Sequence, residues 1–217
     1  MVLALTYGGI VHVEWRREMA KSRLEMQIEF CKEIDKEKQI TRQTYLTDGS
    51  RKENDAEHAW HMAIMAAVLE EYSNEKIDLL RSIIMMLLHD VVEIDAGDTF
   101  AYDEEGKKDQ RERELKAADR LFNILPEDQA KYFRQLWDEF EAMSTPEAKF
   151  ARTLDNIQPT MLNASSGGKS WREKGVHINQ IMERQSYTGD GSEKLWEYSF
   201  QNYIKPHVEN GVIKSDK

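Results

Sequence analysis

An unbroken apolar run from Ile83 to Leu88 leads directly into His89 and Asp90, and it constrains the fold more than any other stretch of the chain. The segment from Glu75 to about His89 has the apolar content of a helix buried at the centre of a domain. A bare carboxylate beside leucines costs on the order of several kcal/mol to bury. A bound cation would remove that cost. We therefore predict a divalent metal at the end of a core helix.

Helical patterns also fill most of the remaining chain. Only four prolines and eleven glycines interrupt it, and they cluster between the helical stretches. Asn54 and Glu57 have the spacing of a capping box, which predicts that a helix begins there. We find no alternating strand pattern between residues 18 and 217. The expected helices cover 18–39, 54–72, 75–89, 109–124, 127–142, 146–164, 175–185 and 193–209, with loops at 41–52, 91–106 and 165–170.

Together these segments predict an all-α fold, a compact helical bundle in a single domain over residues 18–217. A core in a chain of 217 residues can bury about 70% of the unfolded surface, so no disulfides are needed. Residues 1–17 are apolar and β-like, unlike the rest of the chain. They lack the basic start of a signal peptide. We expect an N-terminal extension without a catalytic role, either an extra strand or arm or an upstream extension of the reading frame.

The charge balance limits the partners of the chain. A net charge of −10 repels the phosphate backbones of DNA and RNA, so we expect no nucleic-acid polymer as a partner. A small anionic substrate stays open, because a metal and one or two arginines can reverse the field locally. No apolar run approaches the ~20 residues that a membrane span requires. The single cysteine, Cys31, allows no intrachain disulfide, which fits a reducing compartment and predicts a cytoplasmic protein.

Two further side chains suited to metal binding lie far from His89 and Asp90 in the sequence. His58 directly follows the capping box, and Asp155 lies in an apolar helical segment. Imidazole and carboxylate ligands suit Mn, Fe, Co, Ni, Zn or Mg, and the lack of cysteine ligands argues against a structural zinc site. Taken singly, each histidine is better explained as a hydrogen-bonded core or surface residue. Taken together, four ligands from three helices would leave an octahedral ion open to water and substrate.

The order His, His-Asp and Asp on successive helices resembles the HD superfamily of metal-dependent phosphohydrolases. The strings ENDAEH (53–58) and LLHDVVEIDAGD (87–98), with the LD pair at 154–155, are similar to its branch of 5′-deoxynucleotidase-like and oxetanocin-related proteins. The resemblance covers roughly residues 25–185. It implies an all-α HD fold and hydrolysis of a phosphoester, with a divalent cation held by His58, His89, Asp90 and Asp155.

The resemblance also implies roles for two carboxylates beyond His89. Glu93 matches the family's acid/base glutamate, and Asp98, after Gly97, matches an aspartate beside substrate and water. If the helix persists beyond His89, Glu93 lies one turn further along the same side. A carboxylate near the metal but not bound to it can then transfer a proton. The alternative is a solvated acidic loop.

Arg42 is the expected partner of the substrate phosphate. The resemblance implies an arginine near this point, in a loop before His58, and a guanidinium suits phosphate through two parallel hydrogen bonds. The match is imperfect, because the loop is slightly longer and Gln43 stands where some relatives have an aromatic residue. Arg51 is the competing candidate, and an ordinary surface role for Arg42 is the alternative.

Three other features carry no functional prediction. His61 follows His58 by three residues, and such a histidine more often packs against a neighbour than binds a metal. The string Gly168-Lys169-Ser170 suggests a phosphate loop, but Asn163 stands where the first glycine belongs and no strand precedes it. Trp171 is compatible with a lid or with a dimer contact.

We predict a metal-dependent phosphohydrolase, and first a phosphomonoesterase acting on nucleoside 5′-monophosphates or a similar small phosphorylated metabolite. In this hypothesis the cation polarises a phosphoryl oxygen and lowers the pKa of a bound water. Asp98 or Glu93 activates the nucleophile, Glu93 protonates the leaving group, and Arg42 neutralises the phosphate. Two alternatives stay open, namely cleavage of nucleotide pyrophosphate or phosphodiester bonds on the same scaffold, and a non-catalytic nucleotide-binding sensor.

A homodimer is also expected. The helices at 127–142 and 193–209 carry more large apolar side chains than one bundle needs, and the resemblance implies the same. These side chains are Trp137, Phe140, Trp196 and Tyr203.

Overall fold

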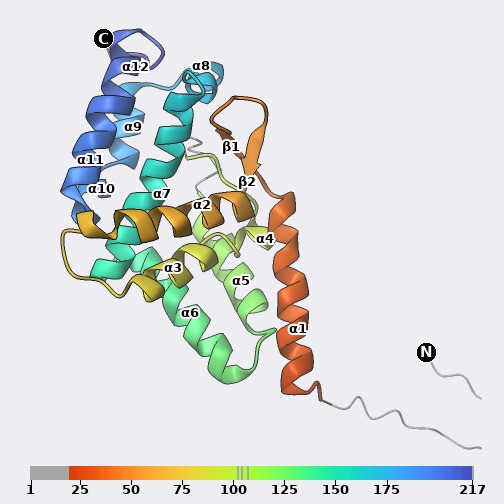
Figure 1. The fold of residues 1–217 in the computed structure, drawn as a ribbon. Helices are drawn as coiled ribbons and strands as arrows, with labels where there is room; N and C mark the ends of the chain where they lie inside the picture. The colour runs from red at the N-terminus through yellow and green to blue at the C-terminus, as the bar shows by residue number, and fades with distance from the viewer. Residues whose placement is uncertain (1–19, 102, 104, 107, 217) are drawn as a thin grey trace, which may run out of the picture.

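The computed structural model describes residues 20–101, 103, 105–106 and 108–216. The expected extension at residues 1–17 lies outside them. The described residues form helices and one two-stranded hairpin (Figure 1), which confirms the all-α prediction. None of the helices in this part of the chain has the length and apolar content needed to cross a membrane.

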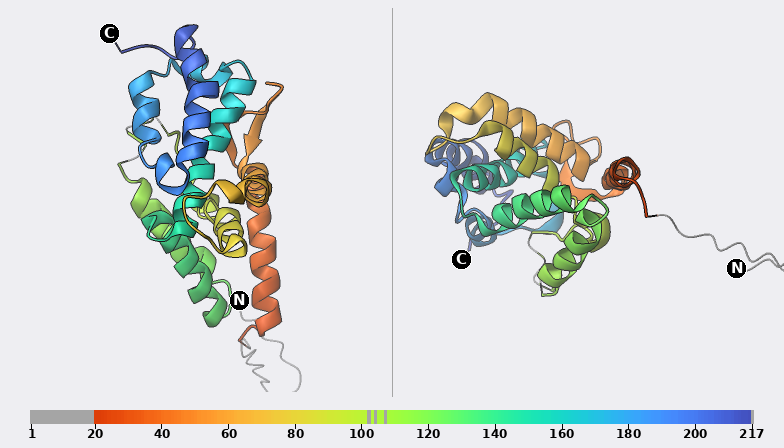
Figure 2. Two further views of the ribbon diagram at one scale, coloured as in Figure 1. Left: turned by 60° about the vertical axis from the view of Figure 1, so that its left-hand side comes forward. Right: turned by 90° about the horizontal axis from the view of Figure 1, so that it is seen from below.

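Three helices build the centre of the molecule: α2 (Asp55–Leu69), α3 (Leu79–Leu88) and α7 (Pro146–Ser165). Helix α7 runs through the middle, and α2 and α3 cross it (Figures 1 and 2). Their inward faces carry side chains that are almost completely buried. The apolar segment before His89 is therefore a core helix, as predicted, although it begins at Leu79. The Asp78 side chain accepts the Arg81 backbone N–H at 3.1 Å and caps the helix there.

The start of α2 follows the predicted capping box. The Asn54 side chain accepts the Glu57 N–H at 2.9 Å, and the Glu57 carboxylate accepts the Asn54 N–H at 3.1 Å. This reciprocal pair places His58 in the first turn of the helix. Helix α7 has a simpler cap: the Thr145 hydroxyl accepts the Ala148 N–H at 3.2 Å, and Pro146 takes the first position of the helix.

The other elements surround this centre. Before α2 come α1 (Arg23–Glu33), η1 (Ile34–Gln39), β1 (Thr41–Tyr45) and β2 (Lys52–Asn54), and η2 (Glu70–Tyr72) follows it. Between α3 and α7 lie α4 (Glu93–Ala96), α5 (Gln110–Phe122) and α6 (Glu127–Ala142). After α7 come α8 (Lys169–Lys174), α9 (Ile178–Arg184), α10 (Thr188–Gly191), α11 (Glu193–Ser199), η3 (Phe200–Ile204) and α12 (Lys205–Glu209).

The hairpin β1–β2 corrects two predictions, the loop at 41–52 and the absence of strands after residue 17. The strands pair antiparallel, with Thr41 opposite Asn54 and Tyr45 opposite Lys52. They escape a pattern search because they are short and almost entirely polar. The turn and the packing against α8 stabilise them instead. Gly49 supplies a positive φ of 68°, and the Lys169 ammonium donates to its carbonyl oxygen at 3.0 Å.

Helix α8 corrects the expected loop at 165–170, since Lys169 already lies in its first turn. The Lys169 ammonium also lies 4.0 Å from the centroid of the Tyr45 ring. The string Gly168-Lys169-Ser170 thus joins α8 to the hairpin. Trp171, the next residue, is buried and packs edge-on against His207, which excludes the exposed dimer contact considered for it.

Candidate metal centre

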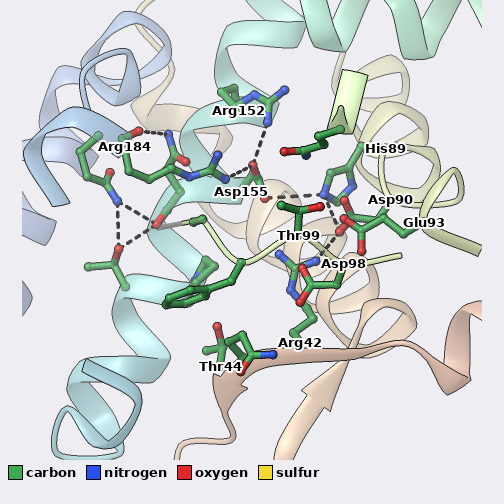
Figure 3. A pocket seen from close by; sticks show the side chains of 18 of the residues that line it. Arg42, Thr44, His89, Asp90, Glu93, Asp98, Thr99, Arg152, Asp155 and Arg184 are labelled. Carbon is green, nitrogen blue, oxygen red and sulfur yellow. Dashed lines mark hydrogen bonds and ion pairs between the residues drawn. The ribbon is translucent and has the colours of Figure 1, made fainter. Parts of the chain in front are cut away.

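Three helices bring metal-binding side chains to one buried point, and Figure 3 shows two of these side chains, His89 and Asp155. His58 comes from the first turn of α2, His89 from the C-terminal end of α3 and Asp155 from the middle of α7. One ligand atom of each lies within 4.8 Å of the others. The three side chains are almost fully buried. The packing of the central helices therefore assembles a cluster that lies scattered over about half of the sequence.

Asp155 presents one carboxylate oxygen to the histidines and holds the other away. Its Oδ1 lies 3.3 Å from His58 Nε2 and 3.6 Å from His89 Nε2. Its Oδ2 accepts hydrogen bonds from Arg152 at 3.1 Å and Arg184 at 3.0 Å. Burial would raise the pKa of Asp155, but contacts with the two histidines and the two arginines lower it well below its usual value. Asp155 is therefore an ionised, oriented ligand candidate.

Asp90 lies beside the same point. Its Oδ2 is 3.0 Å from His89 Nε2 and 3.9 Å from His58 Nε2. It also accepts a hydrogen bond from Arg42 Nη1 at 2.5 Å. His89 Nε2 has no hydrogen-bond partner of suitable geometry among the described residues, although it is buried. A nitrogen left in this way beside two carboxylates is suited to a cation at the same point.

The far nitrogens of both rings are fixed by the protein. His58 Nδ1 lies 2.9 Å from Gln158 Oε1, and Gln158 Nε2 donates to Glu53 at 2.9 Å. His89 Nδ1 donates to the Met86 carbonyl oxygen at 2.8 Å. Because a ring nitrogen that donates carries the proton of the neutral imidazole, both Nε2 atoms are left to bind a metal.

The two histidines titrate in opposite directions. Burial lowers the pKa of His58 to about 4, helped by the charge of Arg42. Burial would also lower the pKa of His89, but the carboxylates of Asp90 and Asp155 raise it to about 10. Without a metal, a proton on His89 therefore balances part of the negative charge of Asp90 and Asp155. A bound divalent cation would take over this role. Two imidazoles and two carboxylates fit Mn, Fe, Co, Ni, Zn or Mg.

Glu93 and Asp98 both line the site, but the helix before His89 does not continue to Glu93 as expected. Helix α3 ends at Leu88 and α4 begins at Glu93, so no continuous helix joins His89 to Glu93. A chain of turns brings the Glu93 side chain back towards the cluster, where its Oε2 is buried without a partner among the described residues. Burial and the charges of Asp90 and Asp55 raise its pKa well above the usual value. Burial also raises the pKa of Asp98. Both side chains line the pocket, which favours the predicted site over the alternative of a solvated acidic loop.

The two arginines considered as phosphate ligands, Arg42 and Arg51, lie in different places. Arg42 lies on β1, nearly buried, and donates to Asp90 and to Asp55 Oδ1 at 3.2 Å. Arg51 lies at the surface, where it pairs with Glu57. Arg42 therefore faces the pocket, and Arg51 stabilises the start of α2.

Several charged residues at the site were missed by the sequence analysis. Glu37, Glu53 and Asp55 are buried around Arg42, and burial raises their pKa values to about 8, 7 and 7. Glu53 and Asp55 stand inside the string ENDAEH, so their nearness to His58 in the sequence was a usable signal. Glu37 gave none. Arg152 stands three residues before Asp155 on the same helix, so its spacing was also a usable signal. Arg184 gave none, because only the fold brings it to Asp155.

His89, Asp90 and Asp155 line one end of a pocket of about 600 Å³, and His58 is fully buried next to them. This volume is typical of sites for small molecules. Trp137 and Phe140 of α6 are buried and line it, so they are not the surplus apolar surface expected from the sequence. Trp171 and Pro159 contribute further apolar walls. Figure 3 shows Arg42 and Asp98 in front of the His89–Asp155 end, with Thr44 further away.

Comparison with known proteins agrees with this geometry. Residues 34–196, which include all four proposed metal ligands, match a family model described as HD domain. The chain belongs to the HD-domain family. A crystal structure of a predicted metal-dependent phosphohydrolase from Magnetospirillum magnetotacticum MS-1 superposes with a TM-score of 0.84 at 46% identity, covering 88% of this chain and 96% of that one.

Curated relatives of this HD-domain protein carry the name 5′-deoxynucleotidase HDDC2. The human protein is 33% identical over 108 residues, which is 50% of this chain and 52% of the relative. The mouse protein is 34% identical over 106 residues, or 49% and 52%. The chain thus spans about half the length of these two relatives.

Proposed function

We propose that this HD-domain protein is a metal-dependent phosphomonoesterase that acts on nucleoside 5′-monophosphates. One observation carries the proposal: His58, His89, Asp90 and Asp155 converge at the end of a pocket that also holds a buried carboxyl group, Glu93. The names of the relatives, a metal-dependent phosphohydrolase and 5′-deoxynucleotidases, support the same reaction class.

His58, His89, Asp90 and Asp155 would hold the metal. Their donor set fits a divalent cation, and buried His89 Nε2 has no hydrogen-bond partner among the described residues. When bound, such a cation supplies Lewis-acid chemistry, polarising a phosphoryl oxygen and lowering the pKa of a bound water. Asp90 and Asp155 provide the negative charge, and the arginines on Asp155 keep its Oδ1 turned towards the site.

Glu93 would transfer the proton. Burial and the charges of Asp90 and Asp55 raise its pKa well above the usual value and so favour the protonated carboxyl, which can donate to the alkoxide that leaves when the P–O bond breaks. Asp98 lines the same pocket and would orient or deprotonate the attacking water.

Arg42 would neutralise the substrate phosphate. It lines the pocket beside the cluster and now pairs with Asp90 and Asp55. A phosphate group would compete with these carboxylates for the guanidinium, and Asp90 would be freed to bind the metal.

A hydrolysis screen in which the products are identified by chromatography tests this function. Protein stripped with a chelator is reloaded separately with Mn, Co, Ni, Fe, Zn or Mg and given nucleoside monophosphates, triphosphates and cyclic dinucleotides. We expect metal-dependent release of phosphate from monophosphates. A clear preference for triphosphates or cyclic dinucleotides favours the pyrophosphohydrolase or phosphodiesterase alternative. Binding of nucleotides without turnover under every metal favours the sensor.

We also propose that the enzyme is a cytoplasmic homodimer. The argument from Trp137 and Phe140 is lost, but α1 and α2 expose other apolar side chains: Leu24, Ile28, Trp60, Ile64 and Val68 are 48–66% exposed. Trp60, Ile64 and Val68 recur every four residues and so form one stripe along α2. Light scattering that gives a particle of about the chain mass, 25.4 kDa, would refute the dimer.

A further inference from the structure

One face of α7 forms a wall along the pocket. Asp155, Pro159 and Asn163 follow each other at intervals of four residues, and all three line the cavity. At about 1.5 Å per residue, Asp155 and Asn163 lie roughly 12 Å apart along the helix axis. This length is comparable with that of a nucleoside monophosphate. A nucleotide whose phosphate lies at the Asp155 end would therefore reach Asn163 with its base.

The Asn163 end of the pocket holds polar side chains without partners. Asn163, Thr44 and Ser170 are 8%, 8% and 4% exposed, and all three line the cavity. Asn163 Oδ1 is buried without a hydrogen-bond partner among the described residues. The carboxamide and the two hydroxyls form no side-chain hydrogen bond anywhere in that part of the chain. A buried atom such as Asn163 Oδ1 is costly to leave without a partner, and a ligand in the pocket would supply one.

Neighbouring polar side chains behave differently. Asn156 Nδ2 donates to Thr188 Oγ1 at 2.9 Å, Thr188 donates to Gln185 at 2.7 Å, and Gln185 donates to Thr160 at 3.0 Å. These contacts tie the four side chains to one another, with only Asn156 Oδ1 left over. Among the described polar residues of this wall, one set is hydrogen-bonded to other side chains of the protein. The other set, around Asn163, has no such bonds and is available to a ligand.

The chemistry of that end favours a neutral heterocycle. Strand β1 and helix α8 both contact α7 and add Thr44, Ser170 and Trp171 to the lining. Figure 3 shows Thr44 beyond Arg42, away from the His89–Asp155 cluster. Amide and hydroxyl groups beside Trp171 and Pro159 match a flat ring with donors and acceptors on its edge. A carboxamide can pair with an adjacent donor and acceptor on a nucleobase.

We propose that Asn163 is a specificity-determining residue that hydrogen-bonds the base of the substrate nucleotide, with Thr44 and Ser170 beside it. This inference rests on the proposed function, since the phosphate end fixes where the base lies. It distinguishes a nucleotide from a phosphorylated sugar as the substrate.

The test compares a nucleotide with the same compound lacking its base. Wild type and Asn163→Ala, each loaded with the most active metal, are assayed on deoxyadenosine 5′-monophosphate and on 2-deoxyribose 5-phosphate. Inhibition by deoxyadenosine and by inorganic phosphate is measured in parallel. Asn202→Ala is the control, because that asparagine is exposed and, within the described residues, its side chain donates only to the Tyr198 carbonyl oxygen.

We expect Asn163→Ala to lower kcat/KM for the nucleotide by roughly 3- to 10-fold and to weaken inhibition by deoxyadenosine by a similar factor. Hydrolysis of 2-deoxyribose 5-phosphate and inhibition by phosphate should stay as in the wild type and in Asn202→Ala. An equal loss on both substrates, or no loss on either, overturns the inference.

The test also provides for a misfolded variant and for an inactive wild type. If circular dichroism shows that Asn163→Ala is misfolded, Asn163→Asp keeps the size of the side chain but lacks the N–H donor, and it should weaken inhibition by deoxyadenosine in the same way. If the wild type hydrolyses neither compound, the proposed function fails. Direct binding of deoxyadenosine to wild type and variant then still decides the role of Asn163.

Discussion

Gln158 holds the imidazole of His58 from the side opposite the metal cluster, with Oε1 2.9 Å from Nδ1. Since Gln158 Nε2 donates to Glu53, Oε1 is the atom that accepts, and the His58 proton is held on Nδ1. The Nε2 lone pair is then turned towards Asp155. One amide thus fixes both the tautomer and the orientation of a proposed ligand.

Gln158→Ala should weaken metal binding about 10- to 100-fold, because the ring loses the partner that orients it. Competition with a chromogenic chelator measures this change. Gln201→Ala, an exposed substitution on η3, is the matched control. Unchanged affinity in Gln158→Ala would mean that the buried packing of His58 is sufficient to orient it.

Glu93→Gln should separate metal binding from turnover. The side chain keeps its shape but cannot transfer a proton, so kcat should fall about 10²- to 10⁴-fold while the metal content stays at the wild-type level. Asp90→Ala should lose both. Elemental analysis and phosphate release on the same preparations distinguish the two. Full activity in Glu93→Gln would exclude the acid/base role.

Arg42→Ala and Arg51→Ala form a natural pair, because of these two arginines the structure places Arg42 in the pocket and Arg51 at the surface. Loss of a charged hydrogen bond to phosphate is worth about 1.5–3 kcal/mol, which corresponds to a fall in kcat/KM on the order of 10- to 100-fold. Arg51→Ala should retain wild-type kinetics with a small loss of stability. Equal effects of both substitutions would assign the phosphate contact elsewhere.

Metal affinity should increase with pH. In the metal-free protein the carboxylates raise the pKa of His89 to about 10, so between pH 6 and 9 an incoming cation must displace its proton. The apparent affinity should rise about tenfold per pH unit, with about one proton released per ion. His58, with a pKa of about 4, adds nothing in this range. Calorimetry in buffers of different ionisation enthalpy counts the protons, and a pH-independent affinity contradicts the prediction.

Glu37 should make the metal-free protein less stable as pH rises. Burial, with the charges of Asp90 and Asp55, raises its folded pKa to about 8 from an ordinary value of 4.5. Between these values the unfolded chain is ionised while the folded protein keeps the proton, so the stability present below pH 4.5 is lost by pH 8. Glu37→Gln lacks this penalty.

Thermal unfolding of chelator-treated Glu37→Gln measures the effect. Its Tm should exceed that of wild type by a margin that grows from pH 5.5 to 8.5, at about 2–4 °C per kcal/mol and on the order of 1–3 kcal/mol in total. Glu75→Gln, at an exposed position, should show no such trend. A difference in Tm that stays constant from pH 5.5 to 8.5 would mean that the substitution stabilises the protein through packing and not by removing a charge.

Most helices could be predicted because their signals are local. The cap at Asn54, the cap at Thr145 and the apolar run before His89 each act within one or two turns. The hairpin β1–β2 could not be predicted in this way. Its stability comes from a Gly49 turn and from Lys169, which lies 120 residues away in the sequence.

The sequence by itself determined the helical class and the identity of the proposed ligands, because periodicity, caps and the strings around His58 and His89 depend on near neighbours. Only the tertiary structure decided which charges meet. His58 and Gln158 are 100 residues apart, and Arg184 meets Asp155 across 29. The opposite pKa shifts of His58 and His89 follow from how each ring packs among arginines and carboxylates. Burial and Coulomb interactions depend on distances in space, which sequence spacing does not specify.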